Sequence, residues 1–265
     1  MTDCLSAIRT ALAGIPVDVR LYDSLDSTNT EAKRNAATIT NPTLYLTRTQ
    51  TAGRGRLGRS FHSPADTGLY MTLALPTERP LCEVVQITAL AAIAATAAIQ
   101  ALTDKRPSIK WVNDLYMDGR KLAGILTEAV AIPETSRTCL IVGIGLNLTT
   151  AAFPPELADT ATSLFLPSEA DRVTPTWIGT LAGNITRRLC GFMDAPSSAT
   201  VGGESCLSFY RRHLCFVGEA VVCTRGSEII PGILRGVDDD YSLLLDTPNG
   251  PLTLASGEIT LRRAT

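Results

Sequence analysis

Histidine, net charge and closely paired cysteines are all scarce in this chain of 265 residues. Only two histidines occur, His62 and His213, and the formal net charge is −2. So weak a charge argues against a general nucleic-acid binder and against a protein that lies on membrane surfaces. We therefore expect neither DNA nor a membrane among its partners.

The cysteines also exclude a class of protein. Their number is odd, and no pair has the CxxC spacing of a zinc or redox motif. Scattered cysteines with two histidines do not form a recognisable ligand set, so we expect no metal site. The pattern is typical of reduced, buried thiols, and we expect a cytoplasmic protein. The cysteines are Cys4, Cys82, Cys139, Cys190, Cys206, Cys215 and Cys223.

Long hydrophobic runs are nearly absent. The first 14 residues contain Asp3 and Arg9 and lack the apolar core of a signal peptide. The stretch 84–102 approaches the length of a membrane span, but it is mostly alanine with interspersed Gln and Thr. We predict a buried helix there, packed against a sheet.

The most informative segment is 49–63, TQTAGRGRLGRSFHS, where arginines alternate with glycines. Arginine offers an always-charged fork for anionic oxygens, and glycine lets the backbone approach a ligand closely. We predict a loop that closes over phosphate or carboxylate groups and orders when a ligand binds. The simpler alternative is a solvated basic loop.

Two nucleotide-binding motifs can be excluded in this segment. Gly53, Gly55 and Gly58 formally match GxGxxG, but Pro64 and a further strand follow where a Rossmann motif requires a helix. The lysine and hydroxyl pair of a P-loop is missing as well.

The periodicity predicts a mixed α+β domain followed by a small β-barrel. Asp118-Gly119 is a favoured two-residue hairpin turn, here between strands 109–117 and 120–129. Turn signals after residue 216 recur at short intervals, as in a barrel. The expected helices are 1–14, 31–37, 84–102 and 177–192, and the expected strands are 17–24, 42–49, 69–75 (ended by Pro76), 109–117, 120–129, 138–148, 221–223, 229–230, 232–237, 242–245 and 252–254, with an irregular loop at 151–175 and a flexible link at 194–205.

For two smaller groups of polar residues, the sequence allows either a structural or a ligand-binding role. Lys121 with Asn113 and Asp114 forms a polar cluster on the hairpin, although a lysine there is usually exposed and Asp114 fits a cap or a salt bridge. The run 27–29, Ser-Thr-Asn, fits either helix capping or ligand binding. His62 is expected to be structural or on the surface.

Together these segments resemble the biotin protein ligase family. The shared motifs are DSTNTEAK at 26–33, TQTAGRGRLGRSFHSP at 49–64, KWVNDLYMDGRKLAGILTE at 110–128, VGIGLNL at 142–148 and GEITLR at 257–262. The resemblance implies a catalytic domain at 1–212, with a mixed sheet flanked by helices as in class II aminoacyl-tRNA synthetases. It also implies an SH3-like C-terminal β-barrel domain at 213–265.

The resemblance implies a two-step, ATP-dependent reaction. Biotin attacks the α-phosphate of Mg²⁺-bound ATP to give biotinyl-5′-AMP, and a lysine of a biotin carboxyl carrier protein of acetyl-CoA carboxylase then takes the biotin. A lipoate or octanoate ligase or transferase of the same fold is the alternative enzyme, and a biotin-responsive DNA-binding regulator is the alternative outside enzymes. A homodimer is compatible, since family members differ.

The resemblance also implies roles for individual residues. The catalytic set is Lys121, Arg56 and Asp114, with Asp114 orienting the incoming lysine amine. The biotin-binding set is Ser27, Thr28, Asn29, Gln50, Gly53, Arg54, Arg56, Lys121, Gly124 and Gly143. The nucleotide-binding set is Arg54, Arg56, Arg59, Phe61, Lys110, Asn113 and Asn147.

The sequence departs from the family pattern in three places. Val112 stands where many members have proline, and we expect it to preserve an extended strand. Phe61 stands where some members have tryptophan. Only about 20 residues precede the first strand, so we expect the DNA-binding module of the repressor members to be missing.

Overall fold

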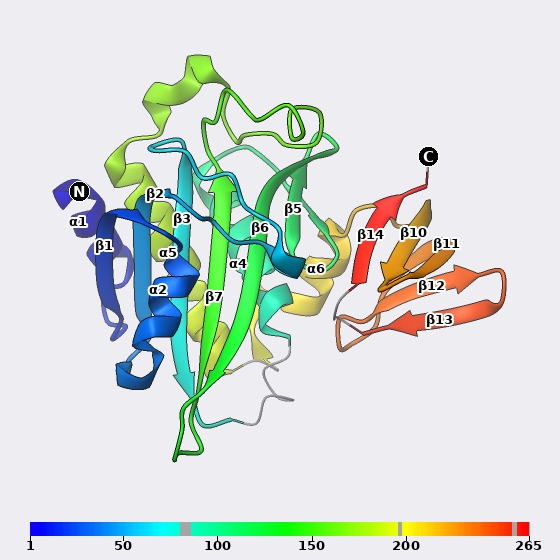
Figure 1. The fold of residues 1–265 in the computed structure, drawn as a ribbon, viewed down its shortest axis with the longest axis horizontal. Coiled ribbons are helices and arrows are strands. Elements are labelled where there is room, and N and C mark those ends of the chain that lie inside the picture. The colour runs from blue at the N-terminus through cyan, green and yellow to red at the C-terminus, as the bar shows by residue number, and fades with distance from the viewer. Residues whose placement is uncertain (80–85, 196–197, 256–258, 265) are drawn as a thin grey trace.

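The computed structural model describes residues 1–79, 86–195, 198–255 and 259–264, which form a large mixed sheet and a smaller antiparallel sheet beside it (Figure 1). The large sheet has seven strands in the order β1-β2-β3-β7-β6-β5-β4. β1 and β2 run parallel and every other pair is antiparallel, so the predicted mixed α+β sheet is confirmed. The strands are β1 (Asp18–Leu25), β2 (Thr43–Gln50), β3 (Gly68–Thr77), β4 (Ser108–Lys110), β5 (Asp114–Met117), β6 (Arg120–Ala131) and β7 (Thr138–Asn147).

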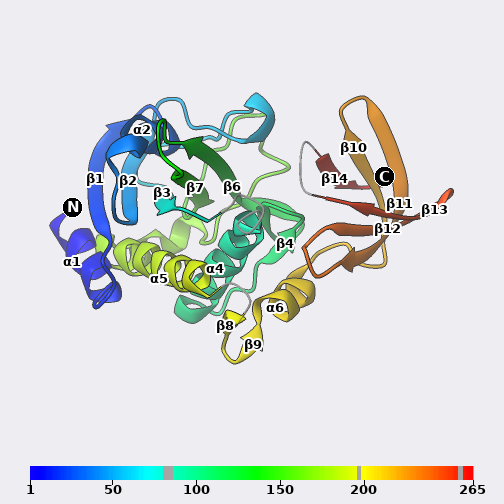
Figure 2. The ribbon, with the colours of Figure 1, turned by 90° about the horizontal axis from the view of Figure 1, so that it is seen from below.

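Helices cover the two faces of this sheet unequally. In Figure 2, α1, α4 and α5 lie on one face, and α2 lies on the other. The face that carries α2 is therefore the one left open for a site. The helices are α1 (Thr2–Ala11), α2 (Thr28–Asn35), α4 (Ile87–Leu102), α5 (Pro175–Asp194) and α6 (Cys206–His213), with short 3₁₀ turns η1 (Ala36–Thr38), η2 (Arg56–Gly58) and η3 (Pro167–Arg172).

The alanine-rich segment is the buried helix that its composition predicts. α4 begins at Ile87, and nearly all of its residues as far as Ile99 are buried in the core. Alanine side chains let it lie close to both α5 and the sheet. Residues 84 and 85 of the predicted helix lie outside the described residues. No helix in the described ranges combines the length and apolar character that a membrane crossing needs.

Two prolines that were predicted to end or separate strands lie within strands instead. β3 continues through Pro76, and a single strand β11 (Glu228–Val237) contains Pro231. β2 pairs with β3 only as far as Ala74, and β12 pairs with β11 only from Ile233 onward. Each proline therefore sits where its strand has a single neighbour, and such an edge position tolerates a missing N–H.

The predicted strand 109–117 is wrong as a continuous element. The chain turns at 111–113, so that β4 and β5 pair with each other as a tight hairpin. Val112 therefore does not preserve an extended strand. Asn113 accounts for the break, because its carbonyl accepts from the Ile125 N–H and its side-chain amide donates to the Ile125 carbonyl. The following Asp118-Gly119 turn is confirmed, with φ of 51° and 75°.

The C-terminal sheet has the strand order β13-β12-β11-β10-β14, and the predicted small β-domain is compatible with an SH3-like fold. β13 and β14 are not paired with each other, so the described strands of this domain do not form a closed barrel. The Trp111 indole N–H donates to the Tyr241 carbonyl at 2.8 Å and ties the two sheets together. The remaining strands are β10 (Ala220–Arg225), β12 (Leu243–Thr247), β13 (Gly250–Leu254) and β14 (Ile259–Arg263).

Two loop predictions meet different outcomes. The segment 151–175 is irregular as expected, apart from η3. The expected link 194–205 contains a short hairpin, β8 (Thr200–Val201) with β9 (Glu204–Ser205), while residues 196–197 lie outside the described ones.

The contact between α1 and α5 yields a stability prediction. A Cβ on Gly179 of α5 would overlap the Cys4 carbonyl oxygen, whereas a Cβ on Gly191 of the same helix meets nothing within 4 Å. We expect Gly179→Ala to lower the free energy of unfolding by about 1–3 kcal/mol, because the two helices must move apart. The control Gly191→Ala should raise it by about 0.5–1 kcal/mol through helix propensity. Urea unfolding measures both, and equal stabilities for the two variants would contradict this packing.

Candidate functional site

A cavity of about 330 Å³ opens on the face of the large sheet that carries α2. Segments from α2, β2, β5, β6 and β7 converge on it, and η2 and β14 also contribute to its wall. Of the residues predicted for the site, all but Gly53 line this cavity: Ser27, Thr28, Asn29, Gln50, Arg54, Arg56, Arg59, Phe61, Lys110, Asn113, Asp114, Lys121, Gly124, Gly143 and Asn147.

Gly53 serves the loop rather than the cavity surface. A Cβ at this position would overlap the Phe61 carbonyl oxygen and approach the Ser63 hydroxyl. The Phe61 N–H also donates to the Gly53 carbonyl, at 2.9 Å. Gly53 therefore allows the two ends of the arginine loop to lie against each other.

The arginine loop, residues 53–61, folds back on itself. The Gly55 N–H donates to the Arg59 carbonyl at 2.7 Å, and Arg54 and Ser60 form an isolated bridge. Leu57 lies in the left-handed region, with φ of 57°, at the tip of the loop and is half exposed. The loop thus has backbone hydrogen bonds of its own, and its ordering on ligand binding stays a prediction.

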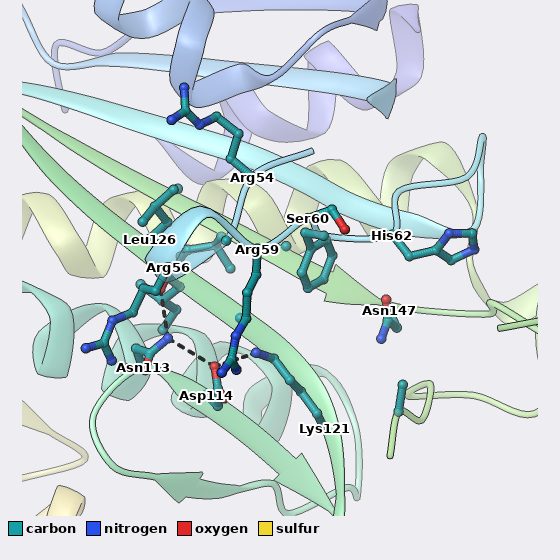
Figure 3. A pocket seen from close by; sticks show the side chains of 18 of the residues that line it. Arg54, Arg56, Arg59, Ser60, His62, Asn113, Asp114, Lys121, Leu126 and Asn147 are labelled. Atoms are coloured by element: carbon teal, nitrogen blue, oxygen red, sulfur yellow. Dashed lines mark hydrogen bonds and ion pairs between the residues drawn. The ribbon is translucent and has the colours of Figure 1, made fainter. Parts of the chain in front are cut away.

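Positive charge is concentrated along the cavity. Five basic side chains line it, and Asp114 is the only acidic residue among the described residues of the wall. Figure 3 shows Arg59 directed toward Asp114 and Lys121 and Arg56 directed toward Asn113, while Arg54 points away from all of them. The basic side chains are those of Arg54, Arg56, Arg59, Lys110 and Lys121.

A chain of polar contacts organises the cationic end of the cavity (Figure 3). The Lys121 ammonium lies 2.7 Å from an Asp114 carboxylate oxygen, and the Asn113 amide donates to the same oxygen at 3.0 Å. Arg56 donates to Asn113 Oδ1 at 2.7 Å and reaches the Ile259 carbonyl of β14 at 3.5 Å. Burial lowers the pKa of Arg56, which still leaves a guanidinium charged at neutral pH. One network therefore joins the loop, the β5–β6 hairpin and the C-terminal sheet.

Lys110 extends the basic wall toward the C-terminal sheet. Its ammonium donates to the Tyr116 hydroxyl at 2.9 Å, and burial lowers its pKa. Burial also raises the pKa of Tyr116 to about 12, so the phenol stays protonated beside the lysine. Burial likewise raises the pKa of the Cys215 thiol to about 12.

The opposite end of the cavity is neutral and polar. Thr28, Asn29 and Gln50 are held there by hydrogen bonds to one another and to the sheet. Ser27 precedes α2 but makes no side-chain capping bond, although it is buried and lines the cavity. Helix capping therefore does not account for the Ser27 hydroxyl.

Three strand glycines make room on the floor of this cavity. A Cβ on Gly143 would overlap the Asn29 amide, and one on Gly145 would overlap the Phe61 ring. A Cβ on Gly124 would approach Lys121 and the same ring. Gly124 and Gly145 are paired across β6 and β7, so the ring of Phe61 rests on a surface free of side chains.

Several contributing residues were missed by the sequence analysis. Trp111, Tyr116 and Phe153 line the cavity, and His62, expected to be structural or at the surface, lines it as well. Trp111 and Tyr116 could have been found, because they lie inside the motif KWVNDLYMDGRKLAGILTE at 110–128. Nothing local marks Phe153, which comes from the irregular loop.

The described residues contain no group of three or more His, Cys, Asp or Glu side chains that could hold a metal ion. Phosphate and carboxylate groups are the ligands that arginine and lysine recognise well. The arrangement therefore suits two anionic groups held side by side, next to a neutral hydrogen-bonding pocket.

Known proteins share both parts of this architecture. Residues 21–147 match the Biotin/lipoate A/B protein ligase family, and residues 216–262 match the Biotin protein ligase C terminal domain. The chain is 32% identical over 248 residues to a "Bifunctional ligase/repressor BirA" of Bacillus spizizenii, covering 91% of this chain and 73% of that protein. It is 29% identical over 238 residues to a "Biotin--[acetyl-CoA-carboxylase] ligase" of Paracoccus denitrificans, covering 88% of this chain and 96% of that protein.

A solved structure agrees with these sequence matches. The biotin protein ligase of Aquifex aeolicus in complex with biotin and ATP superposes with a TM-score of 0.73 and 26% identity, over 93% of this chain and 99% of that one. Its likeness extends over both sheets of the present structure. With the cationic cavity, the strand glycines and the C-terminal sheet all in place, this chain belongs to the biotin protein ligase family.

Proposed function

We propose that the chain is a biotin–[acetyl-CoA-carboxylase] ligase that activates biotin with ATP and then transfers it to a lysine of a carrier protein. One observation carries the proposal: a single cavity joins a wall of five basic side chains to a neutral hydrogen-bonding end. The Aquifex aeolicus protein of the same fold binds biotin and ATP, the two substrates that such a cavity suits. Mg²⁺ enters with ATP as part of that substrate.

The first step brings two anions together. A biotin carboxylate oxygen attacks the α-phosphorus of ATP, the bond to the bridging oxygen breaks, and pyrophosphate leaves. At 4 Å two unit charges repel by about 4 kcal/mol at an effective dielectric constant of 20, which alone would slow the reaction about a thousandfold. Lys121, Arg56 and Arg59 supply the fixed positive charge that cancels this repulsion.

The second step needs a neutral amine. The lysine nitrogen of the carrier attacks the acyl carbon of biotinyl-5′-AMP, and AMP leaves with its phosphate oxygen. Asp114 is the one carboxylate among the described residues of the cavity wall, so it orients the amine and accepts its proton. Its side chain is 17% exposed and already 2.7 Å from an ammonium group, that of Lys121.

The remaining residues divide between the two ends of the cavity. The biotin end, where the wall is neutral, is formed by Ser27, Thr28, Asn29, Gln50, Gly124 and Gly143. The nucleotide end is formed by Lys110, Asn113, Phe61 and Asn147. Arg54 of the loop lies close enough to Glu128 to lower the pKa of that carboxyl. Asn147 is anchored by donating to the Thr162 carbonyl at 3.1 Å.

Biotin is favoured over lipoate as the substrate. The first family includes ligases for both acids, but the second match, over 216–262, is to a domain named for biotin protein ligases. The Paracoccus denitrificans relative, which aligns with 88% of the chain, is a biotin ligase by name. These matches give the lipoate alternative no support.

We further propose that the acceptor is a biotin carboxyl carrier protein, since the Paracoccus denitrificans relative is named for acetyl-CoA carboxylase. The net charge of −2 supports a chain that does not bind DNA. We place the boundary between the two domains at 212/213, the C-terminal end of α6, and a homodimer is the oligomeric state to test.

Purified protein, a carrier domain and ATP test this function directly. We expect the carrier to gain the mass of one biotin when biotin is supplied and no added mass with lipoate, because lipoate lacks the hydrogen-bonding head that the neutral end accommodates. Intact-protein mass spectrometry measures both. Lipoate incorporation without biotin incorporation would refute the proposal.

Lys121 is the sharpest single test of the first step. We expect Lys121→Ala to abolish adenylate formation, a loss of at least about 10³-fold, because the charge that develops at the carboxylate and α-phosphate loses its nearest ammonium. Pyrophosphate release measures the rate, and circular dichroism checks the fold. Lys105→Ala, remote from the cavity wall, is the control and should keep native activity.

Arg56 tests how the loop retains the intermediate. We expect Arg56→Gly to release biotinyl-5′-AMP faster and to label bystander proteins, because the bonds from the loop to Asn113 and Ile259 are lost. Biotin blotting of added bovine serum albumin measures the leak. Arg79→Gly is the control, because the Arg79 guanidinium donates to carbonyls at the end of α5 and Arg79 is not among the described residues that line the cavity; it should leave the blot clean. A tight, selective Arg56→Gly enzyme would contradict this role.

A further inference from the structure

A chain of hydrogen bonds runs from Glu128 on β6 to the neutral end of the cavity. Asn29 Nδ2 donates to Glu128 Oε2 at 3.0 Å and to the Leu126 carbonyl at 3.2 Å. The Thr72 hydroxyl lies 2.6 Å from Asn29 Oδ1. Gly143 lies between Thr72 and Leu126 in the sheet register, and its missing side chain leaves the space in which the Asn29 amide lies.

The acceptors on β6 fix the orientation of the Asn29 amide. A carboxylate and a backbone carbonyl can only accept, so the NH₂ group of Asn29 must face Glu128 and Leu126. Asn29 Oδ1 must then face Thr72, and because Oδ1 can only accept, the single hydroxyl proton of Thr72 points toward it.

The same logic continues to Thr28. Its hydroxyl oxygen lies 2.8 Å from the Thr72 oxygen, which has already given its own proton to Asn29. Thr28 has one hydroxyl proton and two neighbouring oxygens that can accept it, the Thr72 oxygen at 2.8 Å and Gln50 Oε1 at 3.2 Å. The shorter contact is attractive only when Thr28 donates to Thr72, so we assign the proton there. With this assignment the Thr28 oxygen keeps a lone pair and does not donate to Gln50.

Gln50 is fixed from the other side. Its NH₂ group donates to the Ser63 hydroxyl at 2.9 Å, and Ser63 donates onward to the Phe61 carbonyl. Gln50 Oε1 accepts the Thr28 backbone N–H at 2.9 Å and retains a second lone pair. Two acceptor oxygens, on Thr28 and Gln50, therefore stand side by side in the cavity wall.

We propose that Glu128 is a positioning residue: through Asn29 and Thr72 it sets the direction of this hydrogen-bond chain, so that Thr28 and Gln50 present acceptors to a ligand that donates N–H groups. The cyclic urea of biotin carries two such donors, whereas the dithiolane ring of lipoate carries none. The inference rests on the proposed function and deepens it, because it names what selects a urea head.

Lys33 makes it possible to test whether Glu128 sets the direction of the hydrogen bonds or only holds the Asn29 side chain in place. Its ammonium lies 2.8 Å from Glu128 Oε1, and the two side chains are 27% and 26% exposed. Burial opposes ionisation of Glu128, but the hydrogen bonds from Lys33 and Asn29 outweigh it and hold its pKa below the usual value. Exchanging the two residues keeps the ion pair but places an obligate donor beside Asn29.

The charge-swap variant Lys33→Glu/Glu128→Lys is therefore the central experiment. Either the Asn29 NH₂ group faces an ammonium, or the amide turns over and reverses the chain as far as Gln50. We expect the KM for biotin to rise about tenfold or more, with the KM for ATP and the melting temperature close to native. Steady-state pyrophosphate release and thermal unfolding measure these values.

Two variants control for charge and bracing. The Glu128 carboxylate accepts from Asn29 and from Lys33 through different oxygens, so Glu128→Gln alone would leave one of these donors facing an NH₂ group. The double variant Lys33→Met/Glu128→Gln removes the charge and keeps a carbonyl acceptor for Asn29, so its KM for biotin should stay within about threefold of native. Lys33→Met alone removes the ion pair but leaves Glu128 accepting from Asn29, and the same limit applies. A loss in Lys33→Met/Glu128→Gln as large as that of the charge swap would overturn the proposal.

Three further results would overturn the proposed role of Glu128. A folded charge-swap enzyme with native KM for biotin would overturn the proposal, as would a rise in the KM for ATP as large as that for biotin. Should the charge-swap variant not fold, Thr72→Val breaks the same chain without changing side-chain volume, and a native KM in that variant would overturn it instead. A native chain that does not use biotin would refute the proposed function itself, whereas native activity with unaffected variants would refute only the role of Glu128.

Discussion

Several like charges are held close together at one end of the cavity, and this constraint shapes the elements around it. Guanidinium and ammonium groups repel one another, so each needs a partner before the substrates arrive. Asp114 lies against Lys121, and Asn113 and the Ile259 carbonyl accept from Arg56. These contacts come from the hairpin β5–β6 and from β14, so the smaller sheet also contributes to the cationic end of the cavity.

The cavity has two ends of different chemical character, and the sheet explains how they coexist. Strand glycines remove side chains where ligand-facing groups must lie close to the backbone: Gly143 admits the Asn29 amide, and Gly145 admits the Phe61 ring. The helices on the opposite face, among them the alanine-rich α4, bury the back of the same strands in a dense core. The floor can therefore lack side chains without collapsing.

The positive charges and the directed hydrogen bonds have different functions in the cavity. The cationic end acts mainly by Coulomb attraction between its fixed positive charges and the anionic groups of the substrates. The neutral end acts by donors and acceptors whose direction is set by groups behind the wall, and direction discriminates between ligand heads of similar size. Joining the two in one cavity gives an enzyme both the means to activate an acid and the means to choose it.

The sequence alone determined the elements whose signals are local. The Asp118-Gly119 turn, the buried alanine helix and the arginine loop follow from conformational preference, packing and charge within a few residues. Tertiary structure decided the rest. The turn at 111–113 arises because Asn113 bonds to Ile125 across the sheet, which no run of residues around Val112 reveals. Glu128 reads as an ordinary strand carboxylate until Asn29, 99 residues away, is seen to donate to it. Hydrogen bonds and ion pairs between distant segments depend on the register of strands and the placement of helices, and only the folded chain brings those partners into contact.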